Sequence, residues 1–274
     1  MAYADDNGVQ LWYEVKGEGE PLVLTGGFGL LHDQWDRVTD ILARDLKVIN
    51  WHYRGAGKSD RAWPGGYSLD RWVDDLEIIL DHAGIAKAHF WGTSTGSFLT
   101  TRYTARYPQR VKSVITYPLF KANVAFRTAF NGFLYVAENF GYEALAKLTQ
   151  WIGCAEHNVF GGMSNEMAKF EAESFARNFS IESLAKTLEI FGHCDLTSEV
   201  AKLTGPTLLL MGNSGQLAAT APGTAELVEI FKSQCPHAEV ALIERGGGTY
   251  CMLEEPEETA AAVVNWVKRH AKPN

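Results

Sequence analysis

Phe90-Trp91-Gly92-Thr93-Ser94-Thr95-Gly96-Ser97-Phe98 is the stretch that decides how this 274-residue chain folds. Upstream, residues 86–91 form a short apolar run typical of a buried strand. Downstream, the pattern predicts a helix over 95–107 that Pro108 ends. A serine between two glycines at such a junction lies on a turn too tight for bulky neighbours. The turn should therefore present Ser94 at the carboxyl edge of a sheet, facing the positive end of the helix dipole.

The segments around this turn predict an α/β fold. Buried or edge strands are expected over residues 8–16, 22–25, 46–51, 86–91, 111–117 and 240–243. Helices are expected over 33–44, 69–83, 95–107 and 257–270, the second of them capped by Ser68 and stopped by Gly84. Alternating strands and helices imply a mostly parallel, twisted sheet with helices on both faces.

Composition narrows the class of protein further. With 46% hydrophobic and 21% charged residues, the chain can bury one large core. A formal charge of −8 argues against nucleic acid or an anionic membrane surface as a partner. Neither a secretion signal nor a run of membrane-spanning length is visible, so we expect a cytoplasmic protein. Its oligomeric state is left open by the sequence.

Cofactor and metal motifs are not found. The four cysteines, Cys154, Cys194, Cys235 and Cys251, are scattered without metal-ligand spacing and are expected to be reduced thiols. The glycine-rich segment 55–59 lacks the four-residue spacing of a Walker phosphate loop. We therefore expect no nucleotide, no metal and no other cofactor.

The motifs together resemble the α/β-hydrolase fold superfamily, in its capped, serine-nucleophile branch that acts on small molecules. The resemblance rests on Gly92-x-Ser94-x-Gly96, Gly26-Gly27, Arg54-Gly55-x-Gly57-x-Ser59, the strand at 206–212 and the start of the last helix at 253–257. It implies a first core segment over 1–118, a helical cap over 119–195 and a second core segment over 196–274. The cap is rich in phenylalanine, and some of its aromatic side chains should face the space above Ser94.

The resemblance also implies roles for individual residues. Ser94 would be the nucleophile, and the backbone N–H groups of Phe28 and Thr95 would form the oxyanion hole. The general base and its orienting acid are missing, however, from the places where the family keeps them. Thr249 occupies the histidine place, and no carboxylate follows the penultimate strand in 212–216.

Two further substitutions extend this departure. The alternative acid position, after the strand that ends at Tyr117, holds Pro118, and His52 replaces the aspartate of the Asp-x-Arg-Gly segment. A threonine hydroxyl cannot act as a general base near neutral pH. The sequence therefore predicts an incomplete triad.

Other residues could supply the missing group. Four histidines are candidates: His32 near the glycine loop, His52, His157 in the cap and His193 at the end of the cap. Of these, His32 and His193 are expected to reach the pocket most readily. Thr249 or Tyr250 could instead contribute a hydroxyl to the ligand or to Ser94.

Three functions remain open on this basis. The first is an enzyme that hydrolyses an ester, a lactone or a C–C bond in a small apolar or aromatic substrate, using Ser94 and an atypical base. The second is a non-catalytic pseudo-hydrolase that binds a small ligand. The third is a cofactor-free lyase, isomerase or oxygenase.

Overall fold

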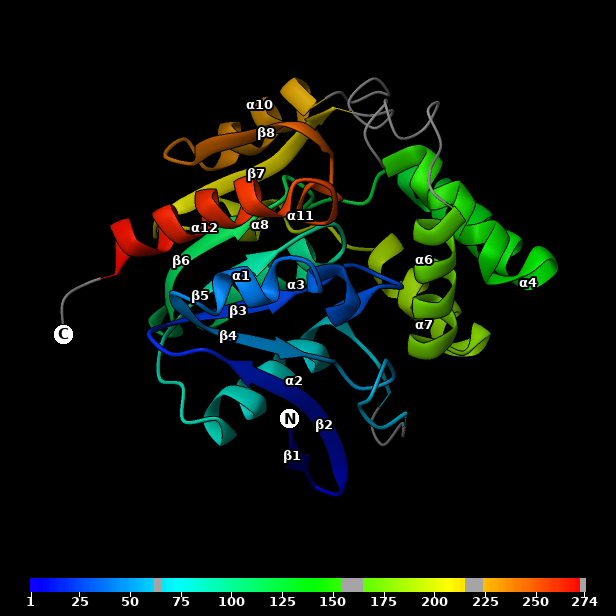
Figure 1. Ribbon diagram of the computed structural model, residues 1–274, viewed down its shortest axis with the longest axis horizontal. Coiled ribbons are helices and arrows are strands. Elements are labelled where there is room, and N and C mark those ends of the chain that lie inside the picture. The colour runs from blue at the N-terminus through cyan, green and yellow to red at the C-terminus, as the bar shows by residue number, and fades with distance from the viewer. Residues whose placement is uncertain (62–65, 154–164, 215–223, 272–274) are drawn as a thin grey trace.

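A computed structural model describes residues 1–61, 66–153, 165–214 and 224–271, and within them eight strands form one sheet (Figure 1). The strands are β1 (Ala2–Asp6), β2 (Val9–Lys16), β3 (Glu20–Thr25), β4 (Leu46–Trp51), β5 (Ala88–Gly92), β6 (Val111–Thr116), β7 (Thr207–Ser214) and β8 (Glu239–Gly247). They lie in the order β1-β2-β4-β3-β5-β6-β7-β8. The pairs β1–β2 and β2–β4 are antiparallel and the others are parallel. The predicted mostly parallel sheet is confirmed.

Side-chain alternation explains why the central strands are apolar on both faces. Leu22 and Leu24 of β3 pack into one hydrophobic cluster, whereas Val23 between them packs into the other. Phe90 and Trp91 of β5 divide in the same way. Successive strand residues point to opposite faces, so a sheet covered on both sides needs a continuous apolar run.

Helices cover both faces of this sheet (Figure 1). On one face lie α1 (Thr39–Leu42) and α12 (Pro256–His270), which contact each other, with α11 (Cys251–Glu254) before α12. On the other face lie α2 (Leu69–His82), α3 (Gly96–Arg106), α8 (Thr197–Val200) and α10 (Thr224–Gln234). As expected, the Ser68 side chain accepts the N–H of Arg71 and caps α2.

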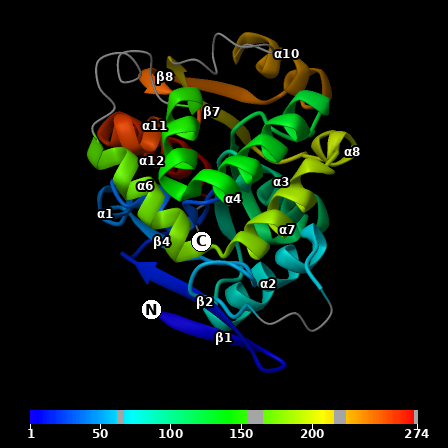
Figure 2. The same cartoon turned by 90° about the vertical axis from the view of Figure 1, so that its right-hand side faces the viewer.

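Three further helices stand apart from the sheet, α4 (Val124–Gly153), α6 (Asn165–Asn178) and α7 (Ile181–Gly192). Figure 2 shows them in front of the core when the molecule is viewed from that side. Lys121 and Asp195 pair as an isolated antiparallel bridge, and their side chains form a 2.6 Å ion pair. The segment that leads from the core into these helices is thus joined to the segment that leads back from them. We propose residues 119–195 as the cap, between core segments 1–118 and 196–274.

Several sequence-based boundaries were wrong. The helix expected over 33–44 is split into a 3₁₀ turn η1 (Leu31–Trp35) and the short α1. The side chains of Asp33 and Gln34 are buried and bonded to distant segments, which is incompatible with the solvent-facing side of a regular helix. In helix α4 (Val124–Gly153), the backbone is non-helical at Gly141, where φ is 81°.

The cysteines described are unpaired thiols. Cys194, Cys235 and Cys251 are free and buried, and Cys154 lies outside the described residues. Burial raises the pKa of Cys194 and of Cys251 to about 12, so both stay protonated near neutral pH. In the described part of the chain, no helix is both long enough and apolar enough to cross a bilayer.

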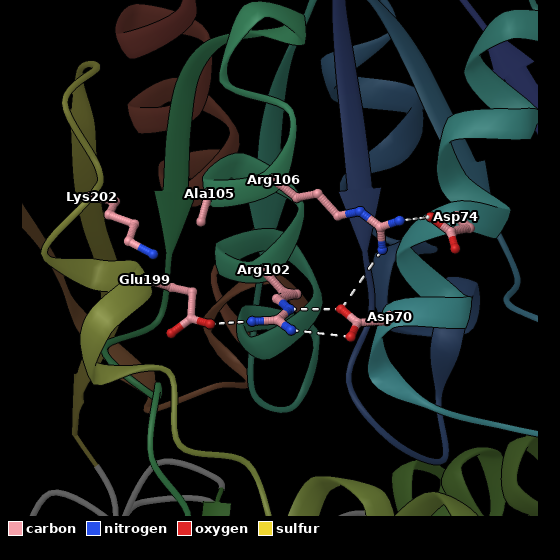
Figure 3. Close-up of a pocket in the computed structure, with 7 residues that line it drawn as sticks. All are labelled: Asp70, Asp74, Arg102, Ala105, Arg106, Glu199 and Lys202. Carbon is pink, nitrogen blue, oxygen red and sulfur yellow. Dashed lines mark hydrogen bonds and ion pairs between the residues drawn. The ribbon is translucent and has the colours of Figure 1, made fainter.

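An open hollow of about 450 Å³ lies between α2, α3 and α8 (Figure 3). The side chains that line it are mostly charged, and most of these charges form ion pairs with one another. Arg102 bonds Asp70 at 2.8 Å and also pairs with Glu199, while Arg106 bonds Asp74 at 2.8 Å. These ion pairs link three helices on the outer face of the sheet. We assign them a structural role in holding the helices together.

One buried histidine should make the stability of this fold depend on pH. His89 on β5 is fully buried, with its Nδ1 2.6 Å from Ser113 Oγ, and burial lowers the pKa of His89 to about 4, with Glu20 opposing. The unfolded chain has a histidine pKa near ~6.5, so it binds the proton more readily than the native state does. The native state is therefore penalised as the pH falls below about 6.5.

We expect His89 to remove about 2 kcal/mol from the free energy of unfolding between about pH 7.5 and about pH 5. Substitution His89→Asn keeps a polar side chain beside Ser113 but cannot titrate. Urea unfolding at the two pH values should show a smaller loss for the variant than for the wild type. Equal losses would contradict this assignment.

Candidate active site

Ser94 lies on the turn between β5 and α3, as the motif predicts. Its φ is +52°, a left-handed backbone that non-glycine residues rarely adopt. The Ser94 side chain is partly exposed, although Thr93 and Thr95 on either side are buried. The strained turn thus pushes this one side chain out of the core.

The two glycines of the motif are required by close backbone approach. A Cβ on Gly96 would lie 2.1 Å from the carbonyl oxygen of Thr25, and a Cβ on Gly92 would lie 2.3 Å from Thr100 Oγ1. Both distances are shorter than any real contact of a methyl group, so only glycine fits. The turn is therefore wedged between the end of β3 and the first turn of α3.

The loop after β3 lies directly against Ser94. A Cβ on Gly27 would stand 2.9 Å from Ser94 Cβ. The Gly27 N–H donates to Gln34 Oε1 at 2.8 Å, and Gln34 Nε2 donates to the carbonyl oxygen of Thr249 at 3.0 Å. One buried glutamine thus ties the loop beside Ser94 to the loop that carries Thr249.

Two backbone donors were expected to form an oxyanion hole, and the structure distinguishes them. The Thr95 N–H has no acceptor among the described residues and stands at the start of α3, where helix N–H groups lack partners. The Phe28 N–H, in contrast, donates to Thr95 Oγ1 at 2.6 Å. The Phe28 donor is therefore already engaged within the protein.

Thr249 and Tyr250 are both largely buried, but of their two hydroxyls only that of Tyr250 has a hydrogen-bond partner among the described residues. The Tyr250 hydroxyl donates to Glu171 Oε1 at 2.8 Å, and Thr149 Oγ1 donates to the same oxygen at 2.9 Å. Glu171 is a buried carboxylate of α6, so Tyr250 connects the core to the cap. The Thr249 hydroxyl has no hydrogen-bond partner in the described part of the chain.

His32 and His52 form a hydrogen-bonded pair. The Lys58 N–H donates to His52 Nδ1 at 2.9 Å, so this nitrogen carries no proton and a neutral His52 is protonated at Nε2. His52 Nε2 then donates to His32 Nδ1 at 2.7 Å, and His32 Nε2 donates to Asp33 Oδ1 at 3.0 Å. Burial is the main cause that lowers the pKa of both histidines, which keeps the pair neutral.

Asp33, at the end of this chain of hydrogen bonds, also binds the cap. Its Oδ2 accepts from Arg177 at 2.7 Å, from Asn178 at 3.2 Å and from Ser174. Asn178 Nδ2 in addition donates to the carbonyl oxygen of Gly29 at 3.0 Å. Helix α6 is therefore bonded directly to the loop that lies beside Ser94.

None of the seven histidines in the described residues is hydrogen-bonded to Ser94. Both ring nitrogens of His32 are engaged by His52 and Asp33. His193 is exposed at the end of α7, with Nδ1 bonded to the carbonyl oxygen of Glu189. The eighth histidine, His157, lies outside the described residues, as does Gly215 in the segment without an acid.

His32, Asp33 and Asp36 form the one group of three potential metal ligands in the described residues, with ligand atoms within 4.8 Å of one another. Asp33 and His32 are already committed to the hydrogen bonds given above. We assign no metal to this group.

Aromatic side chains from the cap contact the Phe28 ring. The ring centroid of Phe28 is 5.5 Å from that of Phe175, 5.7 Å from Phe133 and 5.9 Å from Phe130. A Cβ on Gly29 would lie 1.8 Å from the Phe175 ring, which shows how closely the cap packs on this loop. The surroundings of the Phe28 ring are thus apolar on the cap side.

Three contributors to the site were not found from the sequence, namely Gln34, Glu171 and the His32–His52 pair. Gln34 and Glu171 lie in predicted helices, and no local pattern marks them. The replacement of the usual aspartate by His52 was visible, and an unusual residue at a buried position implies a compensating partner. His32 is that partner.

Comparisons with known proteins identify relatives that this chain resembles along most of its length. The chain is 25% identical to "Putative carbamate hydrolase RutD" of Stutzerimonas stutzeri over 86% of its own length and 88% of that protein. It is 24% identical to the non-heme chloroperoxidase CPO-A1 of Kitasatospora aureofaciens, over 92% and 93% of the two chains.

Solved structures share the fold. The bromoperoxidase of Bacillus anthracis has a TM-score of 0.83 at 22% identity, covering 97% of this chain and 99% of the other. The enol-lactonase of Burkholderia xenovorans has a TM-score of 0.79 at 22% identity, with the same coverage. The sequence profile described as the alpha/beta hydrolase fold matches residues 20–247. The chain therefore belongs to the alpha/beta hydrolase fold family.

Proposed function

We propose that this protein is a hydrolase of small apolar or aromatic substrates, with an ester, a lactone or a C–C bond as the scissile group and Ser94 as the nucleophile. The observation that carries the proposal is the left-handed, partly exposed Ser94 between a buried strand and the start of α3. The apolar side chains around Phe28 favour an apolar substrate. Relatives named as a carbamate hydrolase and an enol-lactonase support hydrolysis as the reaction class.

The proposed reaction begins with attack of Ser94 Oγ on the substrate carbonyl carbon. The Oγ–C bond forms, the carbonyl electron pair moves to oxygen, and the serine proton passes to water. Negative charge on the oxygen is stabilised by the donors around Thr95 and by the N-terminal end of α3. Without a positioned histidine the proton transfer is slow, so we propose an enzyme with a modest rate on simple esters.

Hydrolysis of short p-nitrophenyl esters should be measurable but weak. Donors and binding alone give roughly 10³–10⁴-fold over water when the base is missing. Turnover and labelling of Ser94 by a fluorophosphonate should both be slow and should both disappear in Ser94→Ala. Rapid stoichiometric labelling would show that a base acts on Ser94 after all. Turnover that persists in Ser94→Ala would show that Ser94 is not the nucleophile.

The vacated histidine place should contribute a hydroxyl to the pocket. Because Tyr250 donates its proton to Glu171, we propose that Thr249 is the residue that meets the ligand. Thr249→Val should raise KM or lower kcat about 3- to 10-fold, the effect of losing one neutral hydrogen bond. Tyr250→Phe, its matched control, should instead reduce the free energy of unfolding by about 1–2 kcal/mol because a buried carboxylate loses a donor. If neither variant changes binding or rate, the loop is structural.

Restoring family residues tests the missing triad from the other side. Thr249→His alone should add little, because an imidazole without an orienting acid is poorly placed. Thr249→His combined with Gly215→Asp should raise kcat on p-nitrophenyl acetate by at least about 10-fold. A single Gly215→Asp variant is the matched control and should stay at the wild-type rate. If the double variant is no faster, the loop is not positioned for proton transfer to Ser94.

A non-catalytic ligand-binding protein is the second candidate. It is favoured by one observation, that no described histidine is bonded to Ser94. In that case the wild type itself would hydrolyse esters only at the uncatalysed background rate, and Ser94→Ala would show the same rate. A cofactor-free lyase, isomerase or oxygenase is the third candidate and would show substrate turnover with no acyl or phosphonyl adduct on Ser94.

A further inference from the structure

The Thr95 side chain holds a position for which the proposed chemistry has so far given it no role. Thr95 follows the proposed nucleophile directly and is 1% exposed. Its Oγ1 lies 2.6 Å from the Phe28 nitrogen, a short and buried hydrogen bond between two loops. Since the loop of Phe28 also touches Ser94 through Gly27, the Thr95 hydroxyl lies at the junction of the nucleophile and the oxyanion loop.

The direction of this hydrogen bond is fixed by its chemistry. A backbone N–H can only donate, so Thr95 Oγ1 is the acceptor, and the hydroxyl proton must point elsewhere. No acceptor for that proton occurs within residues 1–61, 66–153, 165–214 and 224–271, and none occurs there for the Thr95 N–H. One residue therefore offers two unused donors beside Ser94.

We propose that the Thr95 hydroxyl is a catalytic donor of the oxyanion hole, a role that rests on the proposed function of Ser94. The Phe28 N–H donates to Thr95 Oγ1, and the polarised hydroxyl in turn donates to the oxygen that becomes negative when Ser94 attacks. The hole then consists of the N–H and the O–H of Thr95, with Phe28 behind them. Chains of hydrogen bonds strengthen each other in a site of low dielectric, which suits a charge that appears only in the transition state.

The alternative is that the Thr95 hydroxyl blocks the hole. In that arrangement the Phe28 N–H is the true donor, and Thr95 Oγ1 merely occupies its position until substrate arrives. The two arrangements predict opposite effects of removing the hydroxyl. If the Thr95 hydroxyl is a donor, its removal lowers the rate of hydrolysis. If it only occupies the Phe28 N–H, its removal frees that N–H and raises the rate.

Thr95→Val removes the hydroxyl at nearly constant shape. We expect its kcat on p-nitrophenyl acetate to fall about 10²-fold, the usual effect of losing one oxyanion donor. Thr95→Ser keeps the hydroxyl and should recover most of this loss. Thr101→Val is the matched control, since Thr101 is a fully buried threonine on α3 whose hydroxyl has no partner in the described chain. It should turn over ester at the wild-type rate.

Phenylboronic acid gives a second measurement that does not depend on turnover. It forms a tetrahedral adduct with a serine oxygen and so carries a negatively charged oxygen into the hole. Its affinity, measured by calorimetry, should fall at least about 10-fold in Thr95→Val and much less in Thr95→Ser. Circular dichroism and urea unfolding of each variant show that any loss occurs in folded protein.

The outcomes separate this inference from the proposed function. If turnover requires Ser94 but Thr95→Val is as fast as the wild type or faster, the donor role is wrong and the hydrolase stands. If turnover does not require Ser94 but the boronate binds and discriminates Val from Ser at position 95, the proposed hydrolase is wrong, and the Thr95 hydroxyl is a donor to a bound anion rather than a catalytic donor. If the wild type does not bind the boronate at all, the donor role is wrong.

Discussion

The left-handed backbone of Ser94 is the constraint on which the rest of the site depends. Holding a non-glycine residue at positive φ costs roughly 1–2 kcal/mol, which the surrounding sheet must supply. The Thr93 N–H bonds to the Thr25 carbonyl, and the Tyr117 N–H bonds to the Gly92 carbonyl. Hydrogen bonds to the ends of the neighbouring strands β3 and β6 thus fix the turn on both sides.

Around this turn the described residues offer hydrogen-bond donors for a negative charge but no hydrogen-bonded base to accept the Ser94 proton. The amide and hydroxyl protons of Thr95 have no acceptor among these residues, while His32 and His52 bond to each other and His32 bonds to Asp33. Such an arrangement can stabilise negative charge but gives Ser94 no strong base. In the proposed hydrolase, proton transfer from Ser94 is the step that this arrangement supports least.

The fold could be predicted from local patterns, because each central strand and its following helix carry their own periodicity and caps. The errors fell where a distant segment overrides the local pattern. Asp33 and Gln34 look like the polar face of a helix, yet both are buried by partners far along the chain, in α6 and at Thr249. The assignment of Thr249 to the place of the usual histidine came from the motif and stays a prediction. The pairing of His32 with His52 could not be predicted, because it depends on the folded loops.

The hydrogen bonds of Asp33 and Asn178 link the order of the Ser94 region to the position of the cap. These residues bond α6 to the very loop that lies against Ser94. Any movement of α6 away from the core would have to break those bonds, which also hold the loop in place. The order of this loop and the seating of α6 on the core are therefore coupled through the free energy of the same few hydrogen bonds.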